Sequence, residues 1–363
     1  MWVAGESERI GSAGTAESRA VQDPPCLCQG ASFRCGWRVD SRRGAAKTAG
    51  TQRSHALTHV NQSVTTSARR GPGATIKAYF LVTKPRIIEL LLVTTVPTML
   101  LAQDGIPPLR VVLVTLIGGS LAAAGANTLN SVYDRDIDML MERTGHRPLV
   151  TGEISPRAGL IYGLILSVAS VVLMFVTTNP LAGILTAVAI AFYVLGYTML
   201  LKRRTAQNIV WGGAAGCMPV LIGWAAVDGG RSWWIPILLF LVVFWWTPPH
   251  YWPLAFRYRD EYELAGVPML PVVAAPRAVG RQIIIYSWVM IATSLVLIPV
   301  AGMGIVYSAA AVVLGAIFLY EAYALSARLR KGDVPIKPMR LFHYSITYLA
   351  LLFLVVATDP FLP

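Results

Sequence analysis

The chain has 363 residues, of which 55% are hydrophobic and 14% charged, and its formal net charge is +12. Soluble globular domains contain about 25% charged residues, so this composition excludes that class and indicates a polytopic membrane protein. The mean hydropathy of +0.56 agrees with this.

The N-terminal segment, residues 1–72, differs in composition from the rest of the chain. Gly, Ser, Thr, Ala and Arg dominate there, with no sustained apolar period. Such a segment cannot bury enough surface to offset the entropy lost on ordering, so we expect a disordered cytoplasmic extension. It lacks the apolar core of a secretory signal peptide, and its acidic residues argue against a transit peptide.

The remainder, residues 73–363, is expected to form one membrane domain. Windows of about 20 apolar residues can cross the ~30 Å hydrocarbon core of a bilayer as helices. Nine such windows occur, at 86–103, 110–129, 158–177, 180–200, 208–227, 233–253, 282–302, 304–326 and 342–358. The sequence therefore predicts an all-α bundle of nine transmembrane helices around a central cavity.

Basic residues between these windows lie almost entirely on one side of the membrane. They gather in the loops after the second, fourth, sixth and eighth windows, whereas the opposite loops contain only Arg110 and Arg231. Cytoplasmic loops carry the excess of Lys and Arg, so we place these four loops and the N-terminus in the cytoplasm, where the cavity should open. The positive charge thus reports topology, and no nucleic-acid partner is needed to explain it.

The stretch NSVYDRDID, after the second window, contains the first cluster of acids. Asn130, Asp134 and Asp138 are spaced i, i+4 and i+8, so they share one helix face, with Asn127 on the same side. Oxygen ligands on one face suit Mg2+, which completes its coordination with water and phosphate oxygens. Asp136 points the other way. A helix that merely became polar on leaving the membrane would not place its acids on one face. Acids near the membrane are also energetically costly, so this pattern favours a functional site.

A second acidic segment, FRYRDEYELAG, follows the sixth window. Asp260 and Glu261 lie there beside Arg257 and Arg259. Alone these are ordinary loop residues, but with the first cluster they could hold one or two metal ions around a diphosphate. The predicted metal ligands are Asp134, Asp138, Asp260 and Glu261. Two sets of windows that each end in acids also suggest two related halves facing one cavity.

Basic residues near both clusters could complete an anion-binding site. Arg143 and Arg147 follow the first cluster, and KRRTAQN joins the fourth and fifth windows. Arg binds phosphate oxygens bidentately and Lys supplies a mobile point charge. Since topology alone requires positive charge here, we single out Lys202 and Arg203, which adjoin a window end.

His250 stands in the aromatic stretch WWTPPHYWPLAF, at the end of the sixth window. A lone His among aromatic residues is commonly structural, and tryptophans commonly form an interfacial belt. The same surroundings would also suit a flat aromatic macrocycle, and His is a common axial ligand of haem iron. The two prolines before it break the helix, which is tolerated where backbone lines a cavity.

Four segments together resemble a known family of membrane enzymes. NTLNSVYDRDID, RPLVTGEIS, YTMLLKRRTAQNIVWGGAAG and PPHYWPLAFRYRDEYELAGVPMLPVV are similar to the intramembrane prenyltransferases. Within that superfamily, KRRTAQN and the PPHYW and AGVPMLP motifs resemble the protohaem IX farnesyltransferase (haem O synthase) branch. The resemblance covers about residues 76–358. The family's second acidic motif falls on residues 260–263. Many members have Asp directly before the tyrosine, whereas this chain has Glu261. The acid that faces the metal could therefore be either Asp260 or Glu261.

The resemblance implies transfer of the farnesyl group of farnesyl diphosphate to a vinyl group of haem B, with addition of water, giving haem O and diphosphate. It implies Mg2+ as cofactor, haem B as a substrate and the downstream haem A synthase as a candidate partner. The predicted catalytic residues are Asn130, Asp134, Asp138, Lys202 and Arg203. The predicted substrate-binding residues are Asn127, Arg143, Arg147, Asn208, His250, Tyr251, Arg257 and Arg259.

Two other functions remain as alternatives. The first is a prenyltransferase for an aromatic quinone precursor. The second is an ion-coupled transporter, although its acids would more often lie at mid-span, whereas here they cluster at one membrane face. We expect the bilayer to be the plasma membrane, with the mitochondrial inner membrane as the less favoured location.

Overall fold

The computed structural model describes residues 71–332 and 335–362, except for the side chains of residues 86–92. The chain divides into two units, Met1–Ser67 and Ala68–Pro363. The first unit, and with it nearly all of the predicted extension, lies outside the described residues. All of the described helices belong to the second unit.

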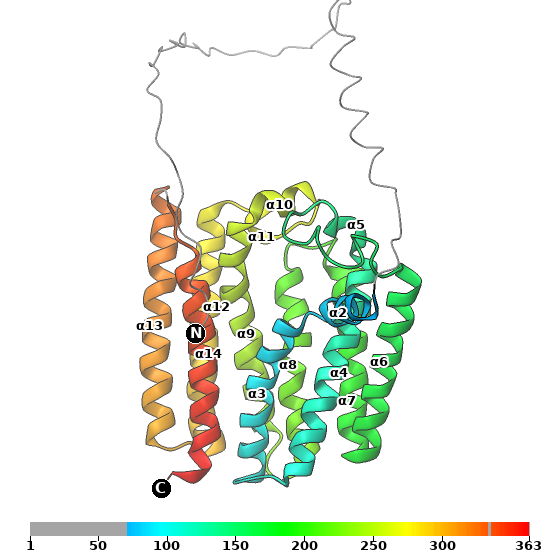
Figure 1. The fold of residues 1–363 in the computed structure, drawn as a ribbon. Coiled ribbons are helices and arrows are strands. Elements are labelled where there is room, and N and C mark those ends of the chain that lie inside the picture. The colour runs from blue at the N-terminus through cyan, green and yellow to red at the C-terminus, as the bar shows by residue number, and fades with distance from the viewer. Residues whose placement is uncertain (1–70, 333–334, 363) are drawn as a thin grey trace, which may run out of the picture. The chain divides into compact units, whose positions relative to one another are not determined.

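The described residues form a bundle of long helices that run beside one another (Figure 1). The long helices are α3 (Pro85–Gln103), α4 (Leu109–Tyr133), α6 (Pro156–Thr177), α7 (Pro180–Ala191) with its π-helical continuation η1 (Phe192–Leu201), α8 (Asn208–Val227), α9 (Trp234–Arg257), α12 (Pro276–Ala301), α13 (Ile305–Lys331) and α14 (Met339–Thr358). The short helices are α2 (Pro72–Val82), α5 (Arg135–Asp138), α10 (Arg259–Leu264), α11 (Leu270–Val273) and the 3₁₀ turn η2 (Asp359–Phe361).

Within the described residues, eight helices are long and apolar enough to cross a membrane. Each of them coincides with a predicted window. The remaining window, 86–103, corresponds to α3, a helix of 19 residues whose side chains are described only in part. The predicted all-α, polytopic membrane bundle is confirmed.

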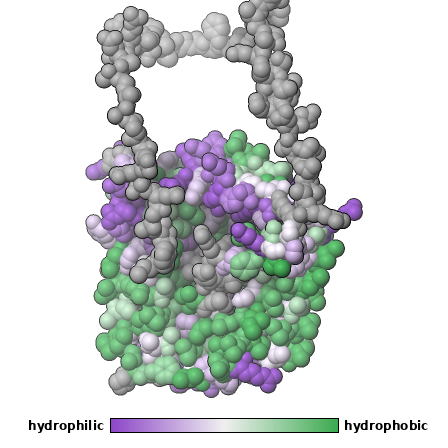
Figure 2. Space-filling model, viewed as in Figure 1, coloured by the Kyte–Doolittle hydropathy of each residue, from purple (hydrophilic) through white to green (hydrophobic). Residues whose placement is uncertain are grey.

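The hydrophilic and the hydrophobic surfaces of the bundle occupy different parts of its length. Hydrophilic residues gather at the end that carries α5, α10 and α11, whereas the sides of the bundle are mostly hydrophobic (Figure 2). Large apolar side chains such as Ile165, Val168 and Val176 are exposed on these sides. In water such a surface would be costly, whereas in a bilayer it contacts lipid chains.

Small residues allow α4 to pack close against α6. A Cβ atom added to Gly125 of α4 would lie 2.5 Å from Ser167 Oγ and 2.9 Å from the carbonyl oxygen of Gly163, both in α6. Ser170 also donates a 2.7 Å hydrogen bond to the backbone oxygen of Gly118. Such close contact through small and hydroxyl residues is typical of helix packing in membranes.

Candidate active site

The three polar residues of the first motif meet at the polar end of α4. Asn130, Asp134 and Asp138 are 4%, 0% and 1% exposed, and Asn130 Nδ2 donates a 2.7 Å hydrogen bond to Asp134 Oδ2. The helix is not continuous as predicted, because Asp134, with φ −86° and ψ 7°, ends α4 before α5 begins. The 2.9 Å backbone bond from Asp138 N to Asp134 O keeps the three together across this break. Asp136 points away, with 60% of its side chain exposed, as predicted.

The π-helix η1 brings two further residues to this cluster. Thr198 Oγ1 accepts a 3.0 Å hydrogen bond from Asn130 Nδ2 and donates to the carbonyl oxygen of Tyr193, five residues earlier. Lys202, at the end of η1, places its Nζ 2.5 Å from Asp134 Oδ2. π-helical turns are rare and often occur at functional sites. Here the wider turn determines the direction in which Lys202 leaves the helix.

Lys84 completes the cluster and was not among the predicted site residues. It lies between α2 and α3 in the left-handed conformation, with φ 57°, and its Nζ donates a 2.7 Å hydrogen bond to Asn130 Oδ1. Asn127 Nδ2 anchors the same turn through the carbonyl oxygen of Thr83, at 3.0 Å. Burial, with a smaller contribution from the cations of Arg147 and Lys202, lowers the pKa of Lys84 to about 7. In sequence, its only signal was its place at the inner edge of the first window.

Two arginines of the loop after α5 connect the acids. Arg147 Nη1 lies 2.6 Å from Asp138 Oδ2. Arg143 reaches the second acidic segment, because its backbone N–H donates to Glu261 Oε2 at 3.4 Å and its guanidinium to the hydroxyl of Tyr262 at 3.3 Å. The two acidic segments therefore face one another, joined through Arg143.

The second acidic segment contributes its residues unequally. Glu261 is partly buried and faces Arg143, whereas Asp260 is exposed. Arg257 and Arg259 are also exposed. Tyr262 is buried, and its hydroxyl lies 3.1 Å from that of Tyr251, which links α10 to α9.

Arg203 and Asn208 lie at the edge of the cluster. Arg203 binds the exposed Asp136 through both terminal nitrogens, at 2.7 and 2.6 Å, and comes only within 3.6 Å of Asp134 Oδ1. Asn208 is fully buried and donates to the carbonyl oxygen of Thr205 at 2.8 Å. This contact holds the turn that carries Lys202.

The donor set at the first motif fits a magnesium ion shared with a phosphate group. Asp134 Oδ1 is buried and has no hydrogen-bond partner among the described residues. Those residues contain no group of three His, Cys, Asp or Glu side chains that could hold a metal ion without other ligands. Mg2+ in phosphate-transfer sites is typically held by one or two carboxylates, waters and substrate phosphates. Asp134 and Asp138 can supply the protein's share.

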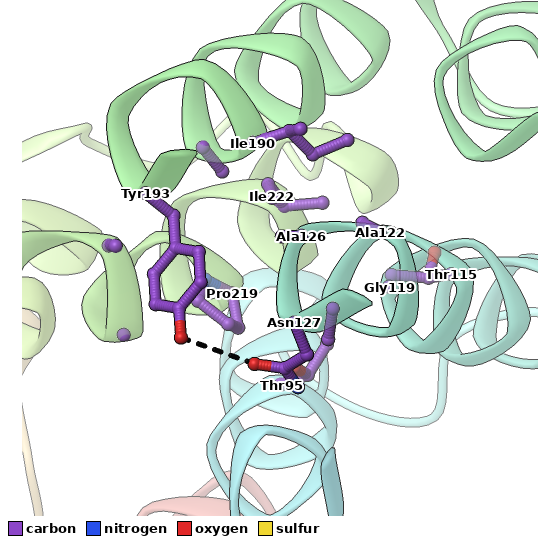
Figure 3. A pocket seen from close by; sticks show the side chains of 14 residues that line it. Thr95, Thr115, Gly119, Ala122, Ala126, Asn127, Ile190, Tyr193, Pro219 and Ile222 are labelled. Atoms are coloured by element: carbon purple, nitrogen blue, oxygen red, sulfur yellow. Dashed lines mark hydrogen bonds between the residues drawn. The ribbon is translucent and has the colours of Figure 1, made fainter. Parts of the chain in front are cut away.

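An apolar cavity of about 140 Å³ lies deeper in the bundle (Figure 3). Residues of α3, α4, α7, η1 and α8 line it: Thr95, Thr115, Gly119, Ala122, Ala123, Ala126, Asn127, Ala189, Ile190, Tyr193, Ala215, Gly216, Pro219 and Ile222. Its polar end is formed by Asn127, whose Oδ1 accepts a 3.3 Å hydrogen bond from the hydroxyl of Tyr193. The cavity therefore leads from apolar walls toward the carboxylate cluster.

His250 belongs to a separate aromatic group at the contact of α9 with α14. Its ring stacks between Trp246 and Phe342, with centroid distances of 4.0 and 4.7 Å. Its Nδ1 lies 2.6 Å from Ser345 Oγ. The hydroxyl of Ser345 donates to the carbonyl oxygen of Phe342, so the imidazole must carry its proton on Nδ1. Both ring faces are covered, and only the Nε2 edge remains to meet a ligand.

Comparison with known proteins identifies the family. Residues 91–346 match the model of the UbiA prenyltransferase family. The chain belongs to this family. Two similar curated relatives are both named protoheme IX farnesyltransferase: that of Streptomyces avermitilis is 56% identical over 305 residues, covering 82% of this chain and 99% of the relative. The protein of Clavibacter sepedonicus is 58% identical over 287 residues, which cover 79% of this chain and 93% of the relative.

Solved structures of UbiA-family proteins share the fold. A UbiA homologue from Archaeoglobus fulgidus bound to GPP and Mg2+ superposes with a TM-score of 0.56 at 18% identity, covering 77% of this chain and 99% of that one. The structure of a digeranylgeranylglyceryl phosphate synthase gives a TM-score of 0.65 at 16% identity, and the match covers 79% of this chain and 99% of that one. At such low identity these matches support the fold alone. The resemblance to intramembrane prenyltransferases inferred from the motifs is confirmed.

Proposed function

We propose that this UbiA-family chain transfers the farnesyl group of farnesyl diphosphate to a vinyl group of haem B, with addition of water, to give haem O and diphosphate. The observation that carries the proposal is the buried cluster of Asn130, Asp134 and Asp138, ringed by cations at the polar end of an apolar cavity. The names of the relatives that are more than half identical to the chain support the same substrates.

The cations around the cluster would take the diphosphate. Lys202 and Arg147 now serve as counter-ions of Asp134 and Asp138, and among the described side chains Lys84 is bound to the neutral Asn130 amide. When substrate enters, all three can turn to phosphate oxygens, which leaves the two carboxylates for a metal ion. Mg2+ held there would neutralise the charge that develops on the leaving diphosphate.

The reaction then proceeds by breakage of the bond between the farnesyl C1 and the diphosphate oxygen. The electron pair leaves with diphosphate, and the resulting allylic cation is attacked by the π electrons of the haem vinyl group. The new cation is captured by water, which loses a proton to form the hydroxyl group. The small apolar residues around the cavity would hold the farnesyl chain and keep water from the first cation.

His250 would meet the haem acceptor through its ring edge. Trp246 and Phe342 cover both faces of the imidazole, so the macrocycle does not stack on it. The Nδ1–H bond to Ser345 leaves the Nε2 lone pair free, which is the arrangement of an axial ligand of haem iron. Tyr251, next in the chain, reaches Tyr262 instead and belongs to the side that faces the second acidic segment.

The test is a farnesyl-transfer assay in membranes, with haem O detected by mass, for the wild type and Asp134→Asn. We expect the wild type to form haem O and the variant to lose at least about 100-fold in rate, on the order of an electrostatic catalytic contact. Asp136→Asn, an exposed acid in the same segment, is the matched control and should stay active. If the wild type makes no haem O but prenylates a hydroxybenzoate without haem, the quinone-precursor alternative replaces this proposal.

The same proposal gives the chain its place in the cell. We infer a multi-pass location in the plasma membrane, with the N-terminus and the end carrying α5, α10 and α11 in the cytoplasm, since Lys and Arg are concentrated in the loops on that side. Farnesyl diphosphate and haem B would then enter from the cytoplasmic side. The product, an apolar haem, would pass within the bilayer to the next enzyme, for which haem A synthase is the candidate partner.

A further inference from the structure

A second hollow lies between the start of α12 and the end of α13, and none of the residues that line it belongs to the two acidic segments. It is a groove of about 500 Å³ lined by Ala275, Arg277, Ala278, Arg281, Ile284, Ile285, Ser326 and Arg330. Its two walls are tied together by a 3.2 Å hydrogen bond from Arg277 Nη2 to the carbonyl oxygen of Arg330. Where α12 and α13 meet beneath it, a Cβ on Gly280 would lie 2.9 Å from Ser326 Oγ, so the helices are in close contact there.

The charges of this groove are not balanced within the described chain. None of Arg277, Arg281 and Arg330 forms an ion pair with an acid of the described residues. Arg340, in the neighbouring helix α14, differs, since it binds Glu321 at 2.7 Å. All three arginines are exposed, and together, with no described acid paired to them, they give this hollow a positive charge that attracts anions.

A hydroxyl group also lines the groove. Ser326 is only 4% exposed as a residue and makes no hydrogen bond to any described residue, but its Oγ is not one of the fully buried atoms without a partner and so is accessible from the groove. It can therefore donate or accept a hydrogen bond with a ligand that enters there. Beside it, Ile284 and Ile285 give the lower part of the groove an apolar wall.

The position of the groove along α12 sets its depth in the membrane. Arg281 directly precedes the apolar window 282–302, where the helix leaves the hydrocarbon core. Trp288 of α12 and Tyr323 of α13 lie deeper, seven residues or about 10 Å from Arg281 and Arg330, which are toward the end that carries α11 (Figure 1). Trp288 Nε1 donates a 3.1 Å hydrogen bond to the hydroxyl of Tyr323, so the two helices are also joined below the groove. The groove therefore opens at the level of the lipid headgroups.

We propose that this groove binds one anionic phospholipid, with its phosphate between Arg277, Arg281 and Arg330, its glycerol oxygens at Ser326, and an acyl chain along Ile284 and Ile285. A free phosphate ion would satisfy the arginines but not the apolar wall. A zwitterionic lipid would bring a cation to a site that already has three. Such a lipid would tie α12 to α13 at the same end of the bundle as the active site.

The test measures lipid binding to the full chain in non-ionic detergent by native mass spectrometry. The probes are dioleoylphosphatidylglycerol, dioleoylphosphatidylcholine and inorganic phosphate. We expect a saturable one-to-one adduct with phosphatidylglycerol in the wild type. The double variant Arg281→Gln/Arg330→Gln should weaken it about 30-fold, the factor for two basic contacts to an anionic lipid. The control is Lys331→Gln, which removes one positive charge at the same end of α13 but outside the groove. It should leave the affinity for phosphatidylglycerol unchanged.

A second variant keeps the charges and fills the space. Ala278→Phe retains all three arginines and should abolish the adduct. An adduct that survives in both groove variants, or equal binding of phosphatidylcholine by the wild type, overturns the proposal. Inorganic phosphate that displaces phosphatidylglycerol at equal concentration would show that the groove takes free phosphate rather than lipid, which also overturns it. Because the readout is lipid mass, the result does not depend on farnesyl transfer.

Discussion

Lys84 is the residue whose importance depends most on the fold. It touches Asn130, 46 positions later in the chain, and carries a positive charge into the cluster that no acid at hydrogen-bond distance neutralises among the described residues. A cation held by a neutral amide is available to a diphosphate without first leaving a carboxylate.

Replacing this lysine should weaken substrate binding. We expect Lys84→Gln to raise the KM for farnesyl diphosphate about tenfold or more, the loss of one charge-assisted hydrogen bond. Lys77→Gln, an exposed lysine of α2 in the same region, is the control and should change KM little. Steady-state kinetics with both substrates would check this, and equal KM values for the two variants would contradict it.

The lowered pKa of Lys84 also predicts a pH dependence. Since that pKa is about 7 rather than 10.5, the side chain is charged below pH 7 and becomes neutral in the substrate-free enzyme as pH rises through 7. Diphosphate binds the charged form, so kcat/KM should fall above pH 7, down to the level of Lys84→Gln. Lys84→Arg stays charged at every pH in this range and should remove the fall. A pH profile from about 6 to 9 for both proteins would decide, and an identical alkaline limb in Lys84→Arg would count against this role.

Among the predicted site residues, the spatial arrangement of those close in sequence was predicted best, while their role in catalysis stays a prediction. Asn130, Asp134 and Asp138 were separated correctly from Asp136 because one helical turn relates them, and local spacing survives even the break at Asp134. The part played by Arg203 could not be predicted in the same way. Its pairing with Asp136 depends on the contact of two segments 67 positions apart.

At the level of elements, the π-helix η1 is the feature that hydropathy did not reveal. An apolar window has the same composition whether its hydrogen bonds are α or π, so the sequence predicted its extent but not its pitch. The pitch matters because Thr198 and Lys202 contact Asn130 and Asp134 from it.

The hydroxyl of Thr198 offers a test of this element. Thr198→Val removes the acceptor of Asn130 and the bond within η1, so we expect kcat/KM to fall about tenfold with folding retained. Thr186→Val is the control, because Thr186 is equally buried in the same span and its hydroxyl donates to the carbonyl oxygen of Ala182, with no described residue of the carboxylate cluster as partner. Kinetic assays and thermal unfolding of both variants separate the roles, and a similar loss in Thr186→Val would assign the effect to packing.

The walls of the cavity offer a second test at this scale. Gly119 of α4 lines the cavity, and a Cβ added there would meet no atom within 4 Å. Gly119→Ala should therefore be tolerated, whereas Gly119→Phe should fill the space and raise the KM for farnesyl diphosphate more than that for geranyl diphosphate. Competition between the two diphosphates checks this. Unchanged selectivity in Gly119→Phe would place the prenyl chain elsewhere.

At the scale of the whole molecule, the proposed reaction would use two chemically different regions. The carboxylate cluster lies where α4, η1 and the turn before α3 meet, and the aromatic group of His250 lies between α9 and α14. No metal ion is expected to bridge the two, since the proposed metal ligands all belong to the first region and its facing acidic segment.

Removal of Mg2+ should therefore separate the two functions. We expect a chelator to abolish haem O formation and to weaken farnesyl diphosphate binding, while haem B binding, followed by its absorption spectrum, persists. His250→Ala should have the opposite effect: it should lower the affinity for haem B and leave the binding of farnesyl diphosphate unchanged. If chelation releases haem as well, the two regions are not independent.

The sequence by itself determined the membrane class, the positions of the long helices and the presence of an acidic cluster at one end. These follow from hydropathy and helical period, which are properties of contiguous segments. Only the tertiary structure decided that Lys84 joins the cluster, that Glu261 rather than Asp260 faces Arg143, and that the faces of His250 are covered. Each of these depends on how helices distant in the chain are rotated and packed against one another, and a helix of given composition can be set at any rotation until its neighbours are in place.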